Sequence, residues 1–233
     1  NTTGLTSMDV RLTDAWADPP GRADTLHTER LVRFSSTAWS YLPALSAPPP
    51  TAPPGDGTGT VVFGSFNNAA KLSHHTVALW ARVLAAVPKS RLLLKGSGLE
   101  DPAFQSLLRD RFAAREVDPC RIDFLGRTPG LESHLAVYHQ IDIALDTFPY
   151  HGTTTTCEAL WMGRPVLSLR GTRFTARVGD SLLSSAGLGD WVAADLDGYV
   201  AAGVARASDT SGLDRLSRRL REQVRASPLC ATD

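Results

Sequence analysis

Residues 145–158 read LDTFPYHGTTTTCE, and this stretch decides the fold. It follows the apolar run 141–145, whose composition is typical of a buried parallel strand. It precedes the helical pattern of residues 159–162, which Gly163 closes. A strand therefore runs into a glycine turn and then into a helix, the unit from which α/β folds with parallel sheets are built.

Four consecutive threonines, Thr153 to Thr156, follow Gly152 at the start of the predicted helix, and we call residues 152–156 the threonine turn. The first backbone N–H groups of a helix lack partners, and the helix dipole makes this end positive. The turn would offer N–H and hydroxyl donors to a diphosphate at the edge of the sheet. A single threonine would be explained as an N-cap, but four exceed what a cap needs. We expect Gly152, Thr153, Thr154 and Thr155 to bind an anion.

From Val61 onward the chain alternates strand and helix patterns, which predicts a doubly wound, Rossmann-like parallel sheet. Strand cores are predicted at residues 61–63, 92–94, 122–124, 141–145, 166–169 and 191–192. Helices are predicted around residues 80–87, 102–112, 131–139, 176–185, 197–207 and 213–226. Ligands of such sheets bind outside the carboxyl ends of the strands, so the loops after the first, third and fourth strands are candidate site loops.

Two further zones precede this sheet. Residues 1–45 hold one strand pattern at 8–13 and a short helical pattern at 25–31. Because one strand cannot bury itself, we expect this zone to dock on another part of the protein. Residues 46–59 carry five prolines and three glycines, which indicates an extended linker. Residues 60–233 would form the α/β domain.

The composition indicates a soluble globular protein with a substantial core. The 233 residues are 42% hydrophobic and 21% charged with a net charge of zero, which argues against nucleic acid or an anionic membrane as a partner. No apolar run approaches the roughly 18 residues of a membrane span. The cysteines, Cys120, Cys157 and Cys230, form neither a disulfide framework nor a metal cluster, so we expect a cytoplasmic protein without a metal. The chain opens with Asn1 and shows no signal-peptide pattern, which suggests a piece of a longer protein.

Lys71 lies in the loop after the first predicted strand. Residues 64–73 contain a glycine and two asparagines, which permit a tight turn just before the expected N-cap at Ser73. A lysine at this point could reach over the crevice and offset the charge on a departing phosphate. A solvated surface lysine is the alternative, because most lysines are exposed. The threonine turn at a nearby strand end favours the site.

Two more candidates lie close to the sheet edge. The loop containing Arg127 and Thr128 has backbone groups that could bind the edge of a nucleobase, and His134 could stack on the ring. The alternative is a histidine that packs against its helix neighbours. Glu158 falls in the first two turns of the threonine helix, where its carboxylate could accept hydrogen bonds from ribose or could only stabilise the helix start.

Several segments together resemble one known family. Residues 63–71, 78–81, 145–158 and 227–230 look like the C-terminal catalytic region of the O-GlcNAc transferase and Spindly family, and residues 1–45 resemble the end of its N-terminal catalytic lobe. The resemblance implies a GT-B glycosyltransferase, in which two Rossmann-like lobes face each other and the C-terminal lobe holds the nucleotide sugar. It implies transfer of GlcNAc or fucose to serine or threonine of a protein acceptor, although bacterial members that modify asparagine leave the acceptor atom open.

The resemblance also implies a role for each matching residue. Lys71 would contact the diphosphate and support the leaving group. Further donor contacts would come from Thr154 and Thr155 on the phosphates, Glu158 on the ribose, His134 against the base and Asn68 beside the donor. The animal members carry basic residues near the base where this chain has Leu131 and Val137, so UDP-GlcNAc and GDP-fucose both stay open as donors.

Parts of that family's enzymes are missing from this sequence. The N-terminal lobe is represented by one strand and one helix, and the helical repeats of about 34 residues that hold acceptors are absent. We therefore expect the catalytic base to lie in the rest of a parent protein. Lys71 and the helix dipole would offset the charge of the leaving diphosphate in place of a metal. The alternative is a non-catalytic nucleotide-sugar-binding or scaffold module that keeps the fold without transfer.

Overall fold

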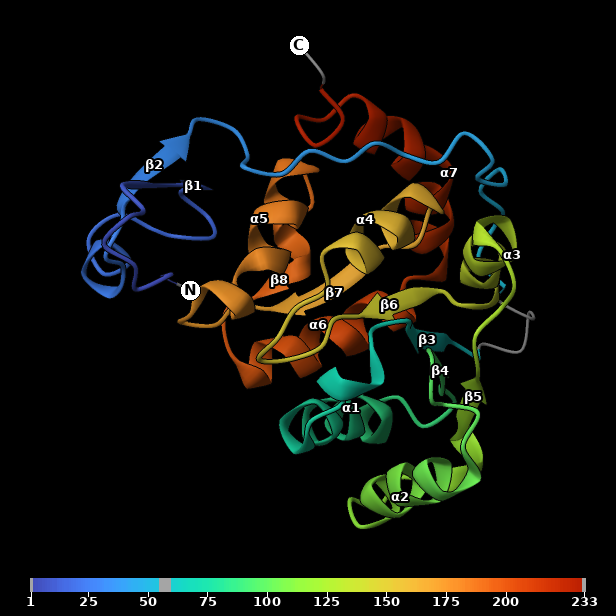
Figure 1. Ribbon diagram of the computed structural model, residues 1–233. Coiled ribbons are helices and arrows are strands. Elements are labelled where there is room, and N and C mark those ends of the chain that lie inside the picture. Colours follow the sequence, from blue (N-terminus) through green and yellow to red (C-terminus); the bar gives the residue numbers. More distant parts are fainter. Residues whose placement is uncertain (1, 55–59, 232–233) are drawn as a thin grey trace.

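The structure of the chain, a computed structural model, describes residues 2–54 and 60–231. Within them, a six-stranded parallel sheet has the strand order β5-β4-β3-β6-β7-β8 (Figure 1). Its strands are β3 (Val62–Ser65), β4 (Arg91–Lys95), β5 (Ile122–Leu125), β6 (Ile143–Leu145), β7 (Val166–Leu169) and β8 (Val192–Ala193). Each predicted strand core overlaps one of these strands, so the expected doubly wound, Rossmann-like sheet is confirmed.

Helices cover both faces of this sheet (Figure 1). On one face lie α1 (His74–Ala86), α2 (Pro102–Ala113) and α6 (Leu196–Ser208), and on the other lie α3 (Leu131–Ala136), α4 (Thr154–Trp161) and α5 (Val178–Ser185), while α7 (Thr210–Arg225) packs beside α4 and α6. All predicted helices of this domain are present, but residues 131–139 are divided between α3 and a 3-10 turn, Val137–Gln140. No helix of the described residues is long and apolar enough to cross a membrane.

The predicted helix boundaries are formed by local hydrogen bonds and one glycine. Ser73 caps α1 and Asp101 caps α2, each with a side-chain oxygen that accepts a backbone N–H, at 3.2 and 2.9 Å. Gly163 ends α4 with a φ of 76°, a conformation that favours glycine. These boundaries determine where the loops at the edge of the sheet begin.

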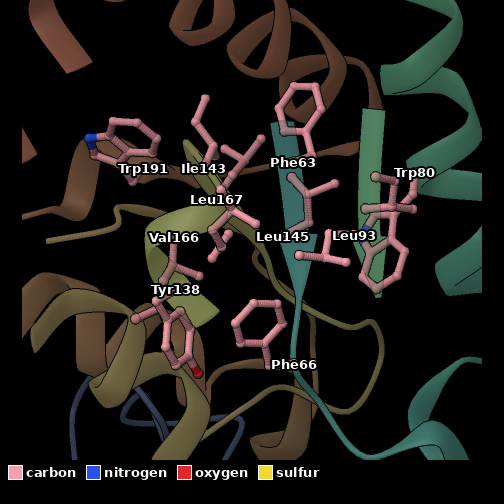
Figure 2. Packing of buried hydrophobic residues seen from close by; sticks show 14 of the residues in the cluster. Phe63, Phe66, Trp80, Leu93, Tyr138, Ile143, Leu145, Val166, Leu167 and Trp191 are labelled. Carbon is pink, nitrogen blue, oxygen red and sulfur yellow. The ribbon is translucent and has the colours of Figure 1, made fainter. Parts of the chain in front are cut away.

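The core lies between the sheet and its helices. Figure 2 shows Phe63 of β3, Leu145 of β6 and Leu167 of β7 together with Trp80 of α1, and each is at most 1% exposed. Burial of such a side chain contributes about 1.5–3 kcal/mol. The two central strands, β3 and β6, are therefore held firmly at the centre of the molecule, and so are the starts of the loops that follow them.

The N-terminal residues form a second, smaller sheet. β1 (Val10–Asp14) pairs in parallel with β2 (Arg30–Phe34). The helix expected at residues 25–31 is therefore wrong, because only Asp24–Leu26 form a 3-10 turn and the residues after it enter a strand. A helix of this length is not stable by itself, whereas pairing with β1 supplies backbone partners along the whole of β2.

This small sheet docks on the α/β domain through the end of β1. Asp14 is buried and its carboxylate accepts a hydrogen bond from Ser181 Oγ on α5 at 2.6 Å. Arg177 Nε donates to the carbonyl oxygen of Trp16 at 2.7 Å. The expected docking of residues 1–45 is made by the end of β1 and the residues directly after it.

The described part of the proline-rich segment, residues 46–54, lies against the α/β domain. Arg164 is fully buried, and its Nη2 donates to the carbonyl oxygens of Thr51 and Ala52, each at 3.1 Å. Burial lowers the pKa of Arg164 to about 10. The guanidinium thus fastens this segment to the domain. Residues 55–59 of the expected linker lie outside the described residues.

Candidate functional site

The strand order of the sheet reverses between β3 and β6, because β4 follows β3 on one side and β6 lies on its other side. Such a switch point opens a crevice at the carboxyl ends of the strands. The loop after β3 carries Lys71, and the loop after β6 carries the threonine turn. These loops are far apart in the sequence, and the fold brings them into contact.

Lys71 lies in a 3-10 turn with its ammonium group against the residues that precede the threonine turn. Nζ donates to the His151 carbonyl oxygen at 2.8 Å and to Asn67 Oδ1 at 3.3 Å, and it lies 4.6 Å from the centre of the Tyr150 ring. Burial lowers the pKa of Lys71, and the Asp146 carboxylate opposes this shift. The side chain is thus held in the crevice and does not extend freely into solvent.

Asn67, which the sequence did not single out, joins the two loops. It is buried, and its Oδ1 also accepts a hydrogen bond from Thr155 Oγ1 at 3.1 Å. Gly152 leaves room for this contact, because a Cβ there would lie 2.5 Å from Thr155 Oγ1 and 3.1 Å from Asn67 Oδ1. The expected residue Asn68 is exposed, and its side chain accepts the N–H two residues further on at 2.9 Å. The two adjacent asparagines indicated a turn at the site, but only their burial in the structure shows that Asn67, and not Asn68, faces the crevice.

The helix start at the threonine turn has free donors. No side-chain hydrogen bond from Thr153 caps α4. Among the described residues, the backbone N–H groups of Thr154, Thr155 and Thr156 have no acceptor. They lie at the positive end of the helix dipole, beside the ammonium group of Lys71. An anion bound there would satisfy these donors.

Two buried residues hold the threonine turn in place, and sequence reasoning missed both. Asp146 accepts hydrogen bonds from Gly152 N at 2.7 Å and from Ser168 Oγ at 2.8 Å. The buried ring of His151 accepts Gly179 N at Nδ1, at 2.9 Å. These partners come from β7 and α5, so no local sequence pattern could have revealed them. Contacts with β7 and α5 therefore fix the threonine turn before any ligand binds.

A second cluster lies between α3 and α4. His134 Nε2 lies 3.1 Å from Glu158 Oε2, and the Tyr138 hydroxyl donates to the same oxygen at 3.3 Å. The other ring nitrogen, His134 Nδ1, lies 2.7 Å from Lys95 Nζ at the end of β4. Figure 2 shows Tyr138 beside Phe66, and their ring centres are 4.4 Å apart. The expected residues His134 and Glu158 are therefore in contact, while Lys95 is an addition that the sequence did not indicate.

Burial shifts the pKa values of Lys95 and Tyr138 in this second cluster. It lowers the pKa of Lys95, a shift that the Glu158 carboxylate opposes. Burial, followed by the charge of Glu158, raises the pKa of Tyr138 well above its ordinary value. The tyrosine hydroxyl therefore keeps its proton over the physiological pH range and can donate it to Glu158 Oε2 at 3.3 Å or to the Thr155 carbonyl oxygen at 3.1 Å.

Arg127 and Thr128 lie apart from these contacts. They follow β5, which is separated from β3 by β4. Arg127 is exposed, and the Thr128 hydroxyl is buried without a hydrogen-bond partner among the described residues. The structure places both at the carboxyl edge of the sheet, but it brings neither into contact with Lys71 or the threonine turn.

The described site combines positive groups with two carboxylates, the buried Asp146 beneath the threonine turn and Glu158 in the second cluster. Lys71 and the start of α4 could hold two phosphates, and Glu158 could receive the hydroxyls of an attached ribose. Residues 2–54 and 60–231 contain no group of three or more histidine, cysteine, aspartate or glutamate side chains that could hold a metal ion.

Comparisons with known proteins identify the family. The sequence pattern of glycosyl transferase family 41 matches residues 54–233. The probable UDP-N-acetylglucosamine–peptide N-acetylglucosaminyltransferase SPINDLY of Solanum lycopersicum is 43% identical over 99% of this chain and 25% of its own length. The corresponding protein of Arabidopsis thaliana is 41% identical over the same shares. The chain thus spans about a quarter of the length of these curated relatives.

Two solved structures resemble this fold. A mutant O-GlcNAc transferase of Thermobaculum terrenum has a TM-score of 0.86 and 40% identity, covering 97% of this chain and 42% of that chain. The C-terminal domain of a group 1 family glycosyl transferase of Francisella tularensis shares the fold alone, with a TM-score of 0.53 and 14% identity over 70% of this chain and 84% of that chain. These likenesses confirm the α/β lobe of a GT-B glycosyltransferase, and with the pattern match over residues 54–233 they show that the chain belongs to glycosyl transferase family 41.

Proposed function

We propose that this chain is the donor-binding lobe of a protein O-glycosyltransferase, which takes its sugar from a nucleoside diphosphate. The contact between Lys71 and the residues leading into the threonine turn carries this proposal, because it brings an ammonium group to the uncapped start of α4. These donors converge in the crevice where the strand order reverses. Two adjacent phosphates are the ligand that this combination fits best.

Transfer breaks the bond between the sugar and the diphosphate, so negative charge grows on the departing phosphate oxygen. Lys71 would stabilise that charge together with the positive end of α4. The His151 carbonyl and Asn67 Oδ1 already orient Nζ, so little reorganisation is needed when the donor binds. We therefore assign Lys71 a catalytic role and expect the reaction to need no metal ion. Turnover that EDTA abolishes and Mg²⁺ restores would contradict this expectation.

The second cluster would hold the nucleoside. Glu158 would accept the ribose hydroxyls, His134 would lie against the base, and the loop with Arg127 and Thr128 would reach the edge of the base. The plant relatives are named as probable UDP-N-acetylglucosamine–peptide N-acetylglucosaminyltransferases, which supports UDP-GlcNAc as the donor. The resemblance to Spindly enzymes keeps GDP-fucose as the second donor to test.

The complete reaction requires a longer protein in this proposal. The N-terminal lobe, of which the sheet of β1 and β2 is the last part, would supply the catalytic base and one wall of the acceptor groove. Tetratricopeptide-type helical repeats would hold the acceptor protein. The cysteines of the described residues are all free, which supports a cytoplasmic location.

Calorimetric titration of the chain with UDP, GDP and their sugars tests the proposal. We expect UDP or GDP to bind, and Lys71→Met to weaken that binding. Lys89 is exposed in the turn before β4, so Lys89→Met is a matched control that should bind as the unmodified chain does. No binding of either nucleotide would refute the proposed function. Binding without any transfer by the full-length parent would favour the non-catalytic module instead.

A further inference from the structure

Lysine is rare in this chain, and two of its lysines lie at the candidate site. The sequence contains three lysines and 21 arginines. Lys71 and Lys95 belong to the two clusters described above, whereas Lys89 is exposed at a turn. Arginine has a large planar head and lysine has a compact one, so the two do not substitute for each other at a confined point. A lysine at position 95 therefore indicates that a compact ammonium group is needed there.

Lys95 is a buried side chain with few partners. It is 3% exposed, and its Nζ lies 5.9 Å from the centre of the Phe66 ring. An ammonium group has three N–H donors, but within the described residues the hydrogen bond recorded for Nζ is the one to His134 Nδ1 at 2.7 Å. Burial of a charge is costly unless hydrogen bonds compensate it, and one such bond compensates Lys95 only in part. Its partner is a residue of the candidate site.

This contact determines where His134 carries its proton. Because an ammonium group can only donate, Nδ1 must accept, and the neutral ring then carries its proton on Nε2. Nε2 lies 3.1 Å from Glu158 Oε2 and so donates to it. The Tyr138 hydroxyl lies 3.3 Å from the same Oε2 and shares its one proton with the Thr155 carbonyl oxygen at 3.1 Å. No hydrogen bond within the described part of the chain engages Oε1. Glu158 is therefore fixed by one oxygen and keeps the other for a ligand.

We propose that Lys95 is a positioning residue, which acts through His134 to hold Glu158 so that Oε1 receives the ribose hydroxyls. This inference rests on the proposed function, because it takes the ligand to be a ribonucleoside diphosphate. Without the donor at position 95, His134 can carry its proton on Nδ1. Nε2 then becomes an acceptor that faces a carboxylate, and Glu158 loses its fixed orientation.

The binding test compares nucleotides with and without the ribose 2′-hydroxyl. UDP, GDP and their 2′-deoxy forms are titrated into the unmodified chain, Lys95→Met, Lys95→Arg and the control Lys89→Met. Lys95→Met should weaken the ribonucleotide by about tenfold and its 2′-deoxy form by less than about threefold. Lys95→Arg retains N–H donors and should recover much of the affinity. Lys95→Met should add little in a Glu158→Gln background, because both changes remove the same contact.

The tautomer of His134 is a second readout that does not depend on a nucleotide. ¹⁵N-edited NMR should show the proton on Nε2 in the unmodified chain and a mixture of tautomers in Lys95→Met. A proton on Nδ1 in the unmodified chain would overturn the proposal even if Lys95→Met failed to fold. Equal losses for the ribose and 2′-deoxy forms would overturn it too, while leaving the proposed function intact. If no nucleotide binds to the unmodified chain, the proposed function fails and the role of Lys95 toward ribose fails with it.

Discussion

The ammonium group of Lys71 is oriented by oxygen atoms of the protein itself. The His151 carbonyl and Asn67 Oδ1 take two of its N–H groups, and no third acceptor lies within the described residues. The third N–H is therefore available to a ligand, which is a phosphate in the proposed function. The ring of Tyr150, itself 56% exposed, borders the same ammonium group and shields it in part from water.

Replacing this charge should damage turnover more than affinity. Lys71→Met in the full-length parent should reduce turnover about 100-fold or more, because one preorganised donor to the departing phosphate is lost. Steady-state kinetics with the donor measures the effect, and Lys89→Met serves as the control. Full turnover by the Lys71→Met enzyme would show that another residue stabilises the departing phosphate.

Lys71 should also give the site an alkaline limit. Burial lowers its pKa from the ordinary 10.5, so the ammonium group loses its proton at a lower pH than a free lysine does. Diphosphate affinity should stay high below this lowered pKa and fall as the pH rises through it. Calorimetry from neutral pH to 10.5 would follow the fall. If the diphosphate affinity of Lys71→Met fell over the same alkaline range, the loss of affinity would belong to the titration of another group.

Residues with a local signal were predictable, and residues defined by distant contacts were not. The threonine turn and Lys71 could be placed in loops at strand ends from the sequence, because glycine, asparagine and threonine mark such turns. Lys95 and Asp146 gave no such signal, since their partners lie on α3, β7 and the threonine turn. Asn67 and Asn68 are adjacent, and only the packing of the loop decides which of them turns inward.

At the scale of elements, α4 is the helix that would face the ligand in the proposed function. Its eight residues run from Thr154 to Trp161, and its last turn is anchored by the buried Met162 and by Gly163. The first turn, in contrast, has free N–H groups and no cap. A helix that is firmly held at one end and unsatisfied at the other is suited to bind an anion.

Removing two hydroxyl groups from this turn should weaken anion binding without unfolding the domain. Thr154→Val with Thr155→Val should cost about 1–3 kcal/mol of nucleoside diphosphate affinity. Calorimetry measures the affinity, and thermal unfolding checks the fold. Thr172→Val, at an exposed threonine after β7, is the control. Unchanged affinity in the double variant would remove the threonine turn from the site.

Elements too were predictable where their own residues determine the structure, and were misread where the structure depends on a distant partner. The run 92–94 is apolar throughout and the run 166–169 has Ser168 as its one polar residue, which is typical of strands covered on both faces, so the main sheet was predictable. β2 was misread because its five residues mix arginine with apolar side chains and fit either period. Its structure depends on pairing with β1, which lies on the far side of a turn.

At the scale of the whole molecule, the N-terminal sheet lacks a cover among the described residues. Val10, Leu12 and Phe34 are 42%, 59% and 46% exposed. A two-stranded sheet with such side chains needs a further packing surface. We propose that the rest of the N-terminal lobe provides it and faces the crevice from the other side.

The chain alone should therefore bind a donor and transfer nothing. The attacking hydroxyl would have neither a base nor a groove to position it. A radiolabelled-sugar assay with this chain and an acceptor peptide would measure transfer, with the full-length parent as the positive control. Robust transfer by the chain alone would place the catalytic base within these residues.

Arg164 makes the proline-rich segment part of the folded lobe in an energetic sense. Its hydrogen bonds reach Tyr138 O, Ser217 Oγ, Thr51 O, Thr51 Oγ1 and Ala52 O, and the last three belong to that segment. A lobe cut to begin at residue 60 would lose the three acceptors of Nη2, while Nε and Nη1 would keep Tyr138 O and Ser217 Oγ. Loss of these hydrogen bonds should cost about 1–3 kcal/mol, a sizeable part of the stability of a small domain. A lobe that begins at residue 46 should therefore be more stable than one that begins at residue 60.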